Sequence, residues 1–374
     1  MCGIVELQTD DLSDAEREVA NKVATHLKVH LLADEGWRVE EVQYLRQIRR
    51  AFSTIFIMEA RAAAESRRFV AKKIVHPPIN RAVTQRSNQA MVEFGVLSNL
   101  WKAFERIPDL TVPKPILILP EHEAYVMEYV EGDMLVNCFR CVRHLQPRRS
   151  FHRLVRHYHQ VGEWLRYFQS FTRFGYKGRE GVAEVLERCS LVIDRISKQK
   201  DGRIPPDFAP RIMARLEQLG ALIAPDEVPC CGWHHDFGPW NMIVDKERLA
   251  VIDFLGYSIG PVAMDPIKVL ISLHDESLYF TNSKHRILKL RESFLAGYAP
   301  VAEVPSEVAL LCEALCRLSS VIACLEAKNE RLDRRIARRL IMKKHVRWLY
   351  DGAISDSIWP QSKEAGAAAI IKSA

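Results

Sequence analysis

Residues 232–254 read GWHHDFGPWNMIVDKERLAVIDF, and this stretch decides how the rest of the sequence is interpreted. Asp236 and Asn241 stand five residues apart, and Asp253 follows an apolar run that ends at Ile252. Taken singly, each would be a turn residue or a cap, because Asp and Asn side chains commonly bond nearby backbone groups. Together, at this spacing and between two apolar runs, they indicate a functional site built from carboxylate and amide oxygens.

The spacing suits the chemistry of phosphoryl transfer. That reaction needs a carboxylate beside the attacking hydroxyl and oxygen ligands that hold magnesium against a triphosphate. Asp236 and Asn241, preceded by His234, have the H-x-D-x-x-x-x-N spacing of a kinase catalytic loop. Asp253 lies on the next predicted strand, where a second metal ligand is expected. The stretch therefore predicts one catalytic base and two magnesium ligands.

The sequence before this stretch predicts a small β-rich region. A helix over residues 13 to 32 opens with a capping box of Ser13 and Glu16, and Gly36 ends it. A second helix is predicted from Gln89 to Phe104, with Val92, Val96 and Leu100 at apolar positions. Short β-rich runs give the predicted strands, at residues 52–57, 68–75, 116–119 and 124–129.

After Gly132 the pattern becomes mostly helical, with one β-like island at residues 228–255. This order predicts an α+β, protein-kinase-like fold of two lobes: a small antiparallel β N-lobe with one main helix, and a larger, mostly helical C-lobe. The predicted helices are residues 152–171, 182–196, 211–222, 284–298, 308–325 and 331–350. The expected domains are an N-terminal helical extension (1–36), a nucleotide-binding N-lobe (37–131), and a C-lobe (132–374) that carries the catalytic loop (232–254) and a C-terminal basic helix.

A kinase-like N-lobe also needs a strand lysine for the α- and β-phosphates and a helix glutamate that orients it. Lys72 and Glu93 fit this arrangement. Lys73 fits the same strand pattern in another register. Because successive strand residues point to opposite faces, only one of the two lysines can bind the phosphates.

The sequence resembles the aminoglycoside phosphotransferase and choline kinase family. The matching residues are His234, Asp236, Pro239, Asn241, Ile252, Asp253, Phe254, Gly260 and Asp265. The resemblance implies that Asp236 is the catalytic base, that Asn241 and Asp253 are the magnesium ligands, and that Asp265 supports the catalytic loop. His234 is expected to brace the same loop. Two positions depart from the family pattern, because His235 replaces a glycine and Pro261 replaces an aspartate.

The resemblance extends to the nucleotide-binding lobe, where it favours Lys72 over Lys73. Residues 127–132 resemble the family's hinge, which implies that backbone groups around Glu128 and Val130 bind the adenine. The loop at residues 50–54 contains no glycine, and Ser53 is the expected phosphate-covering residue there. The implied cofactors are ATP or GTP and Mg²⁺.

The charge distribution bears on the acceptor. The chain of 374 residues has a formal net charge of +6, and residues 134–162 contain six arginines and no acid. A basic region after the hinge favours a neutral or anionic alcohol, such as a sugar, a nucleoside-like metabolite or a lipid-linked glycan, over a polycation. The candidate acceptors of the reaction as a whole are a sugar, an amino alcohol and a lipid-linked glycan. No nucleic acid partner is expected, because no groove-reading motif accompanies the basic runs. The C-terminal basic helix is expected to pack on the second lobe, with contact to an anionic membrane as the alternative.

The sequence also bears on the location of the protein and on alternative functions. The N-terminus lacks the pattern of a secretory signal, and Glu313 and Arg317 interrupt the most apolar helix, so a cytoplasmic protein is expected. Met1 to Val5 resembles the start of class II glutamine amidotransferases, but the glutamine-binding elements of that class are missing. A protein kinase and a catalytically inactive nucleotide-binding module are the remaining alternatives. Gly238 argues against the first, because protein kinases usually place a lysine there.

Overall fold

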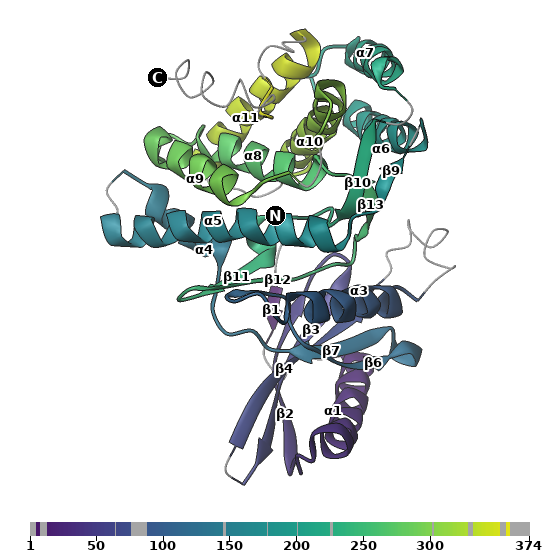
Figure 1. The fold of residues 1–374 in the computed structure, drawn as a ribbon, viewed down its shortest axis with the longest axis vertical. Helices are drawn as coiled ribbons and strands as arrows, with labels where there is room; N and C mark the ends of the chain where they lie inside the picture. Colours follow the sequence, from purple (N-terminus) through teal and green to yellow (C-terminus); the bar gives the residue numbers. More distant parts are fainter. Residues whose placement is uncertain are drawn as a thin grey trace. The chain divides into compact units, whose positions relative to one another are not determined.

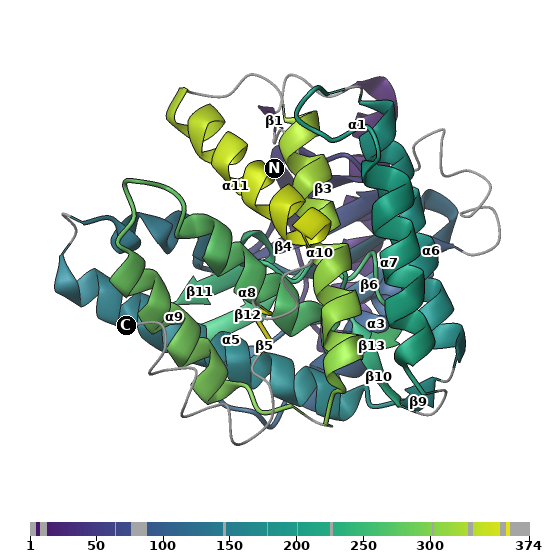
Figure 2. The same ribbon diagram turned by 90° about the horizontal axis from the view of Figure 1, so that it is seen from above.

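The computed structural model describes residues 5–7, 13–63, 65–75, 88–144, 147–177, 179–199, 201–224, 227–300, 303–327, 332–351 and 357–359. The chain divides into two compact units, one formed by residues 1–133 and 242–257 and the other by residues 134–241 and 258–374 (Figures 1 and 2). The first is mainly an antiparallel sheet and the second is mainly helical. The predicted α+β class is therefore confirmed. Cys2, the residue behind the amidotransferase alternative, lies outside the described residues.

The first unit is organised around a six-stranded sheet in the order β1-β2-β3-β4-β7-β6. All neighbouring pairs in it are antiparallel, and β2, β3 and β4 follow one another as hairpins. The strands are β1 (Val5–Leu7), β2 (Glu41–Arg49), β3 (Ser53–Ala62), β4 (Glu65–Ile74), β6 (Pro115–Leu119) and β7 (Ala124–Glu128). The predicted strands at 52–57 and 68–75 correspond to parts of β3 and β4.

Helix α1 (Asp14–Glu35) packs on one face of this sheet (Figure 1). The predicted capping box forms, since Ser13 Oγ accepts from the Glu16 N–H and Glu16 Oε2 accepts from the Ser13 N–H. Leu27 and Leu31 are fully buried against the strands, and each such burial contributes about 1.5–3 kcal/mol. The segment expected as an extension is thus part of the core of the first unit.

Helix α3 (Gln89–Phe104) contacts β4, β6 and β7 and has the predicted limits. Its buried residues are Ala90, Glu93, Leu97, Leu100 and Phe104, whereas Val92 is exposed. The predicted apolar stripe was therefore wrong at Val92, because the buried face is rotated to place Glu93 inward. A 3-10 turn (Pro120–His122) joins β6 to β7.

A second, smaller sheet in the first unit contains β5 (Leu110–Thr111), β11 (Met242–Asp245) and β12 (Arg248–Val251). β11 and β12 form a hairpin, and β12 pairs in parallel with β5 through Leu249 and Leu110. We expected the whole segment 232–254 in the helical lobe. Because of this pairing, residues 242–254 belong to the first unit instead. The boundary between the units also falls within β8 (Asp133–Met134).

The second unit consists mainly of helices (Figure 2). They are α4 (Leu135–Cys138), α5 (Arg148–Phe171), α6 (Arg179–Lys198), α7 (Phe208–Leu222), α8 (Met264–Glu276), α9 (Lys284–Gly297), α10 (Ser306–Glu326) and α11 (Leu332–Asp351). The 3-10 turns at Phe139–Val142 and Pro239–Asn241 and the strands β9 (Gly175–Lys177), β10 (Val228–Trp233) and β13 (Ser258–Pro261) complete it. β10 lies between β13 and β9 in an antiparallel sheet.

Helix α10 is long and apolar enough to cross a membrane, yet most of its apolar window is buried inside the second unit. Its two interior charges are paired, since Arg317 Nη2 donates to Glu313 Oε1 at 2.6 Å. Arg317 also contacts His345 of α11 at 3.0 Å, and the other ring nitrogen of His345 lies 2.8 Å from Asp275 Oδ1 of α8. This pairing explains how a core helix tolerates both charges.

Candidate active site

Lys72, on β4, forms the centre of a buried charge cluster in the first unit. Its Nζ lies 2.7 Å from Glu93 Oε1 and 2.6 Å from Asp253 Oδ1. Burial alone would lower the pKa of Lys72, but the negative charges of Glu93 and Asp253 raise it, so the ammonium group stays charged. Strand alternation explains the choice of lysine. Ala71 packs on the face of the sheet that α1 covers, so Lys72 points to the opposite face, where Glu93 of α3 lies. Lys73 points to the same face as Ala71 and therefore away from Glu93.

Asp253 follows β12 with a backbone φ of 71°, in the left-handed region that non-glycine residues seldom adopt. This conformation directs its carboxylate to Lys72 and also to Arg50, whose Nη1 is 3.4 Å from Asp253 Oδ2. The side chain keeps 24% of its surface exposed. Residues held in such sparsely populated backbone conformations cluster at active sites and ligand clamps.

The catalytic-loop residues lie together in the second unit, between β10 and the turn Pro239–Asn241. Asn241 Nδ2 donates to Asp236 Oδ2 at 2.9 Å and to the Asp236 carbonyl oxygen at 3.0 Å. Trp240 Nε1 donates to the same Oδ2 at 2.9 Å. The Asp236 side chain nevertheless keeps 53% of its surface exposed. The loop thus holds a carboxylate in a fixed orientation that a substrate can still reach.

The orientation of Asn241 leaves its amide oxygen available. Both hydrogen bonds to Asp236 use Nδ2, and Asn241 Oδ1 is buried with no hydrogen-bond partner among the described residues. A buried acceptor without a partner costs about 1–3 kcal/mol unless a ligand satisfies it. Magnesium prefers such oxygen ligands and usually takes only one or two from the protein, with phosphate and water completing its shell. Asn241 therefore has an oxygen that fits one of the two expected magnesium ligands, and the role of Asp253 as the other ligand stays a prediction.

Asp265, at the start of α8, anchors the beginning of the catalytic loop. Its Oδ2 accepts the backbone N–H of His234 at 2.9 Å. Burial raises the pKa of Asp265 to about 7, against the opposing effect of that N–H. The His234 ring is buried and lies edge-on to Phe237. Both residues lie where a loop-supporting role would place them.

His235, one of the two departures from the family pattern, and Gly260, which follows that pattern, both pack against Trp233. His235 has a φ of 67°, and its ring stacks on Trp233 and contacts Ser258 Oγ at 2.7 Å. Burial and the nearby charges of Arg188 and Lys268 lower the pKa of His235 to about 3, so the ring is neutral at pH 7. Gly260 faces the same Trp233 ring, where a Cβ would come within 2.7 Å of Cε3. The ring therefore requires glycine at position 260.

The other residues predicted to bind the nucleotide are Glu128, Val130 and Ser53. Glu128 ends β7, and its N–H already donates to the Lys114 carbonyl at 2.8 Å. Val130 lies in the irregular segment that follows. Ser53 is buried at the start of β3, and its carbonyl accepts the Arg50 N–H at 2.8 Å to close a tight turn. Their contacts with a nucleotide stay predictions.

Sequence reasoning missed two residues that contact the predicted site. Lys268 of α8 donates to Asp236 Oδ1 at 2.8 Å, and Trp240 donates to Oδ2. Lys268 stands three residues after Asp265, so helical periodicity would have placed both on one face of α8. That signal was available once Asp265 had been recognised.

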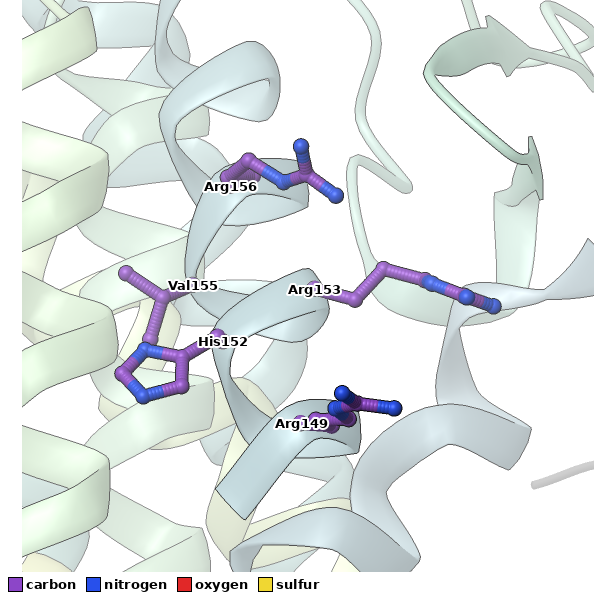
Figure 3. A pocket seen from close by; sticks show the side chains of 5 residues that line it. All are labelled: Arg149, His152, Arg153, Val155 and Arg156. Carbon is purple, nitrogen blue, oxygen red and sulfur yellow. The ribbon is translucent and has the colours of Figure 1, made fainter.

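The basic run after the hinge forms an open hollow along α5, of about 560 Å³, away from these contacts. Its lining residues are Arg149, His152, Arg153, Val155 and Arg156. Figure 3 shows the three arginines extending from one side of the helix. Neither Arg149 nor Arg153 forms a salt bridge with another described residue. Like charges one helical turn apart repel each other, so this arrangement does not serve helix stability.

The features of a kinase-like phosphotransferase are now complete. The β-rich unit contains a buried lysine–glutamate pair, and the helical unit contains a loop in which an aspartate and an asparagine are hydrogen-bonded. The model of the phosphotransferase enzyme family (APH) matches residues 61–311, more than half of the chain. The chain belongs to this family, and it is a small-molecule phosphotransferase with an alcohol group as acceptor. No curated protein matches the chain in sequence.

Several solved structures share the fold of this chain. A choline kinase from Cryptosporidium parvum Iowa II has a TM-score of 0.54 at 12% identity, covering 91% of this chain and 98% of that one. An amicoumacin kinase, solved with AMP-PNP and Ca²⁺, has a TM-score of 0.53 at 15% identity, covering 94% of this chain and 96% of that one. At these identities the similarity establishes the protein-kinase-like fold.

Proposed function

We propose that this protein transfers the γ-phosphate of ATP or GTP, with Mg²⁺, to a hydroxyl group of a small neutral or anionic molecule. The observation that carries the proposal is the loop that contains Asp236 and Asn241. It presents an accessible carboxylate beside a buried amide oxygen that has no partner among the described residues. Phosphoryl transfer uses one group to receive the hydroxyl proton and the other as a metal ligand.

The other residues take roles that their contacts support. Lys72, kept charged and oriented by Glu93, binds the α- and β-phosphates. Asn241 and Asp253 would hold a magnesium ion, which would neutralise charge on the phosphates. Backbone groups around Glu128 and Val130 bind the adenine, and the turn before Ser53 covers the phosphates. His234 and Asp265 keep the catalytic loop in place.

The reaction is a direct in-line transfer. The acceptor oxygen forms a bond to the γ-phosphorus while the bond from that phosphorus to the β–γ bridging oxygen breaks, and the nucleoside diphosphate leaves. The hydroxyl proton passes to Asp236 late in the step. Burial alone would raise the pKa of Asp236, but the charge of Lys268 and several hydrogen bonds hold it at about 2. Such a weak base suits a loose transition state, in which the proton moves after most of the phosphorus–oxygen cleavage.

Nucleotide-dependent release of ADP tests this function. We expect the purified protein to release ADP from ATP when magnesium and a suitable alcohol are both present, in a panel of sugars, amino alcohols and glycans. We also expect chelation of magnesium to weaken nucleotide binding at least about tenfold in calorimetry, because two ligands and the phosphates share the ion. Nucleotide binding that is indifferent to chelation, with no transfer to any acceptor, would indicate an inactive module.

The arginine hollow on α5 supports an anionic acceptor. Arg153 precedes Trp164 by eleven residues, which is about 16 Å along the helix and about 20° around it. The Trp164 ring stacks on Phe237, next to Asp236. The arginines therefore continue the side of α5 that supports the catalytic loop. Guanidinium groups bind phosphate and carboxylate groups in bidentate geometry. A substrate that carries a phosphate or carboxylate some distance from its reacting hydroxyl therefore fits the hollow.

Replacing Arg149 and Arg153 together by glutamine is expected to raise KM for an anionic acceptor about tenfold or more, because charge-assisted hydrogen bonds are lost. The nucleotide KM and kcat at saturation should change little. The matched control is Arg335→Gln with Arg339→Gln, which removes the same charge from exposed positions of α11. Steady-state kinetics with an oligosaccharide and with the same oligosaccharide carrying a carboxylate at its far end compares a neutral and an anionic acceptor of one skeleton, both long enough to span the roughly 16 Å between the hollow and Trp164. Equal KM changes in both double variants would contradict the assignment.

A further inference from the structure

We propose that Lys268 is a positioning residue for the transfer, fixing the Asp236 carboxylate so that Oδ1 faces the acceptor hydroxyl. This inference rests on the proposed function and adds to it a residue outside the catalytic loop. Lys268 belongs to α8, whose neighbouring residues Ile267 and Val269 are buried, so its backbone is held firmly.

Lys268 makes two short contacts with the loop. Its Nζ donates to the carbonyl oxygen of His235 at 2.6 Å and to Asp236 Oδ1 at 2.8 Å. The first contact fixes the backbone immediately before Asp236, and the second fixes the side chain. Since Asp265, one turn earlier on α8, accepts the His234 N–H, a single helix holds three consecutive residues of the loop.

The hydrogen bonds already made by the Asp236 carboxylate show which of its two oxygens is free to react. A carboxylate oxygen has two lone-pair sites. Both sites of Asp236 Oδ2 are used, by Trp240 Nε1 and Asn241 Nδ2. Oδ1 accepts only from Lys268 among the described residues, so one site remains for the acceptor hydroxyl. In the transfer, the acceptor O–H bond breaks and its proton passes to this site on Oδ1.

The loop itself has no room for a lysine near this carboxylate. At Gly238, the position where protein kinases usually have one, a Cβ would come within 2.5 Å of the Trp240 ring. The ring that excludes a side chain at position 238 also lies 5.8 Å from Lys268 Nζ, measured to the ring centroid. The Trp240 ring therefore has two effects. It excludes a side chain at position 238, and its cation–π contact helps to hold the Lys268 ammonium group near Asp236.

The test compares Lys268→Met, which keeps the length and loses the charge, with Lys268→Arg, which keeps the charge. We expect Lys268→Met to lower kcat for transfer to the alcohol about 10- to 100-fold, with an unchanged nucleotide KM, and Lys268→Arg to retain more activity. Hydrolysis of the nucleotide by water should fall much less, because water needs no carboxylate aimed at an alcohol. Lys289→Met, on an exposed lysine of α9, is the control.

A double-mutant cycle with Asp236→Asn separates positioning from other roles. If Lys268 acts through Asp236, adding Lys268→Met to Asp236→Asn should lower kcat no further. An equal fall in both backgrounds would overturn the proposal, because Lys268 would then act independently of Asp236. Wild-type kcat in Lys268→Met would overturn it as well, as would parallel losses of transfer and hydrolysis. A wild-type protein without any transfer activity would instead refute the proposed function.

Discussion

Replacing Asp236 by asparagine is expected to lower kcat for phosphoryl transfer about 10²- to 10⁴-fold, which is the usual contribution of a positioned general base. The amide has the shape of the carboxylate but cannot take the hydroxyl proton. Nucleotide affinity should stay within about twofold, because Asp236 contacts loop residues and Lys268 rather than the Lys72 cluster. Single-turnover transfer and calorimetric nucleotide binding measure the two effects separately.

Asp245→Asn provides the matched control, since Asp245 is exposed at the end of β11. That variant should keep wild-type turnover. Thermal unfolding of Asp236→Asn should show whether the loop stays folded, because the substitution replaces one acceptor oxygen by a donor beside Lys268 and Trp240. Normal turnover in a folded Asp236→Asn protein would exclude Asp236 as the base.

The second large effect is expected at Lys72. Lys72→Met should lower kcat/KM about 10²- to 10³-fold, as the removal of a preorganised charge-stabilising donor usually does. It should also destabilise the protein by about 3–5 kcal/mol, because Glu93 is left as a buried charge without its partner. The activity assay alone would therefore not distinguish phosphate binding from a loss of folded protein.

A compensating variant makes this distinction. Lys72→Met combined with Glu93→Gln removes both buried charges, so most of the lost stability should return. Activity should not return, because the phosphate-binding ammonium group is still missing. Lys73→Met is the control on the same strand, since its side chain leaves β4 on the opposite face. Recovery of activity with stability in the double variant would mean that Lys72 is a structural residue only.

Much of the local structure could be predicted from the sequence. The start of α1 at the Ser13 capping box and the limits of α3 depend on residues within a few positions of each helix end. The spacing of Asp236 and Asn241 likewise sets a contact within one short loop, and the two side chains meet at 2.9 Å. Short-range patterns of this kind report local geometry directly.

The errors arose where packing decides which face of an element is buried. Val92 is exposed and Glu93 is buried on α3, because a partner for the Glu93 carboxylate is supplied by Lys72 on β4. A hydrophobicity pattern ranks these two residues in the opposite order. The β11–β12 hairpin was assigned to the helical lobe for a similar reason, since its pairing with β5 joins segments more than 130 residues apart.

The sequence by itself determined the fold class, most element limits and the oxygen-bearing residues of the catalytic loop, because these follow from periodicity, capping and local spacing. Only the tertiary structure decided which lysine of β4 meets Glu93 and which cation meets Asp236. Both contacts join different elements, and Lys268 is separated from Asp236 by 32 positions along the chain. Such contacts depend on how helices and strands pack, and no local pattern of residues specifies that packing.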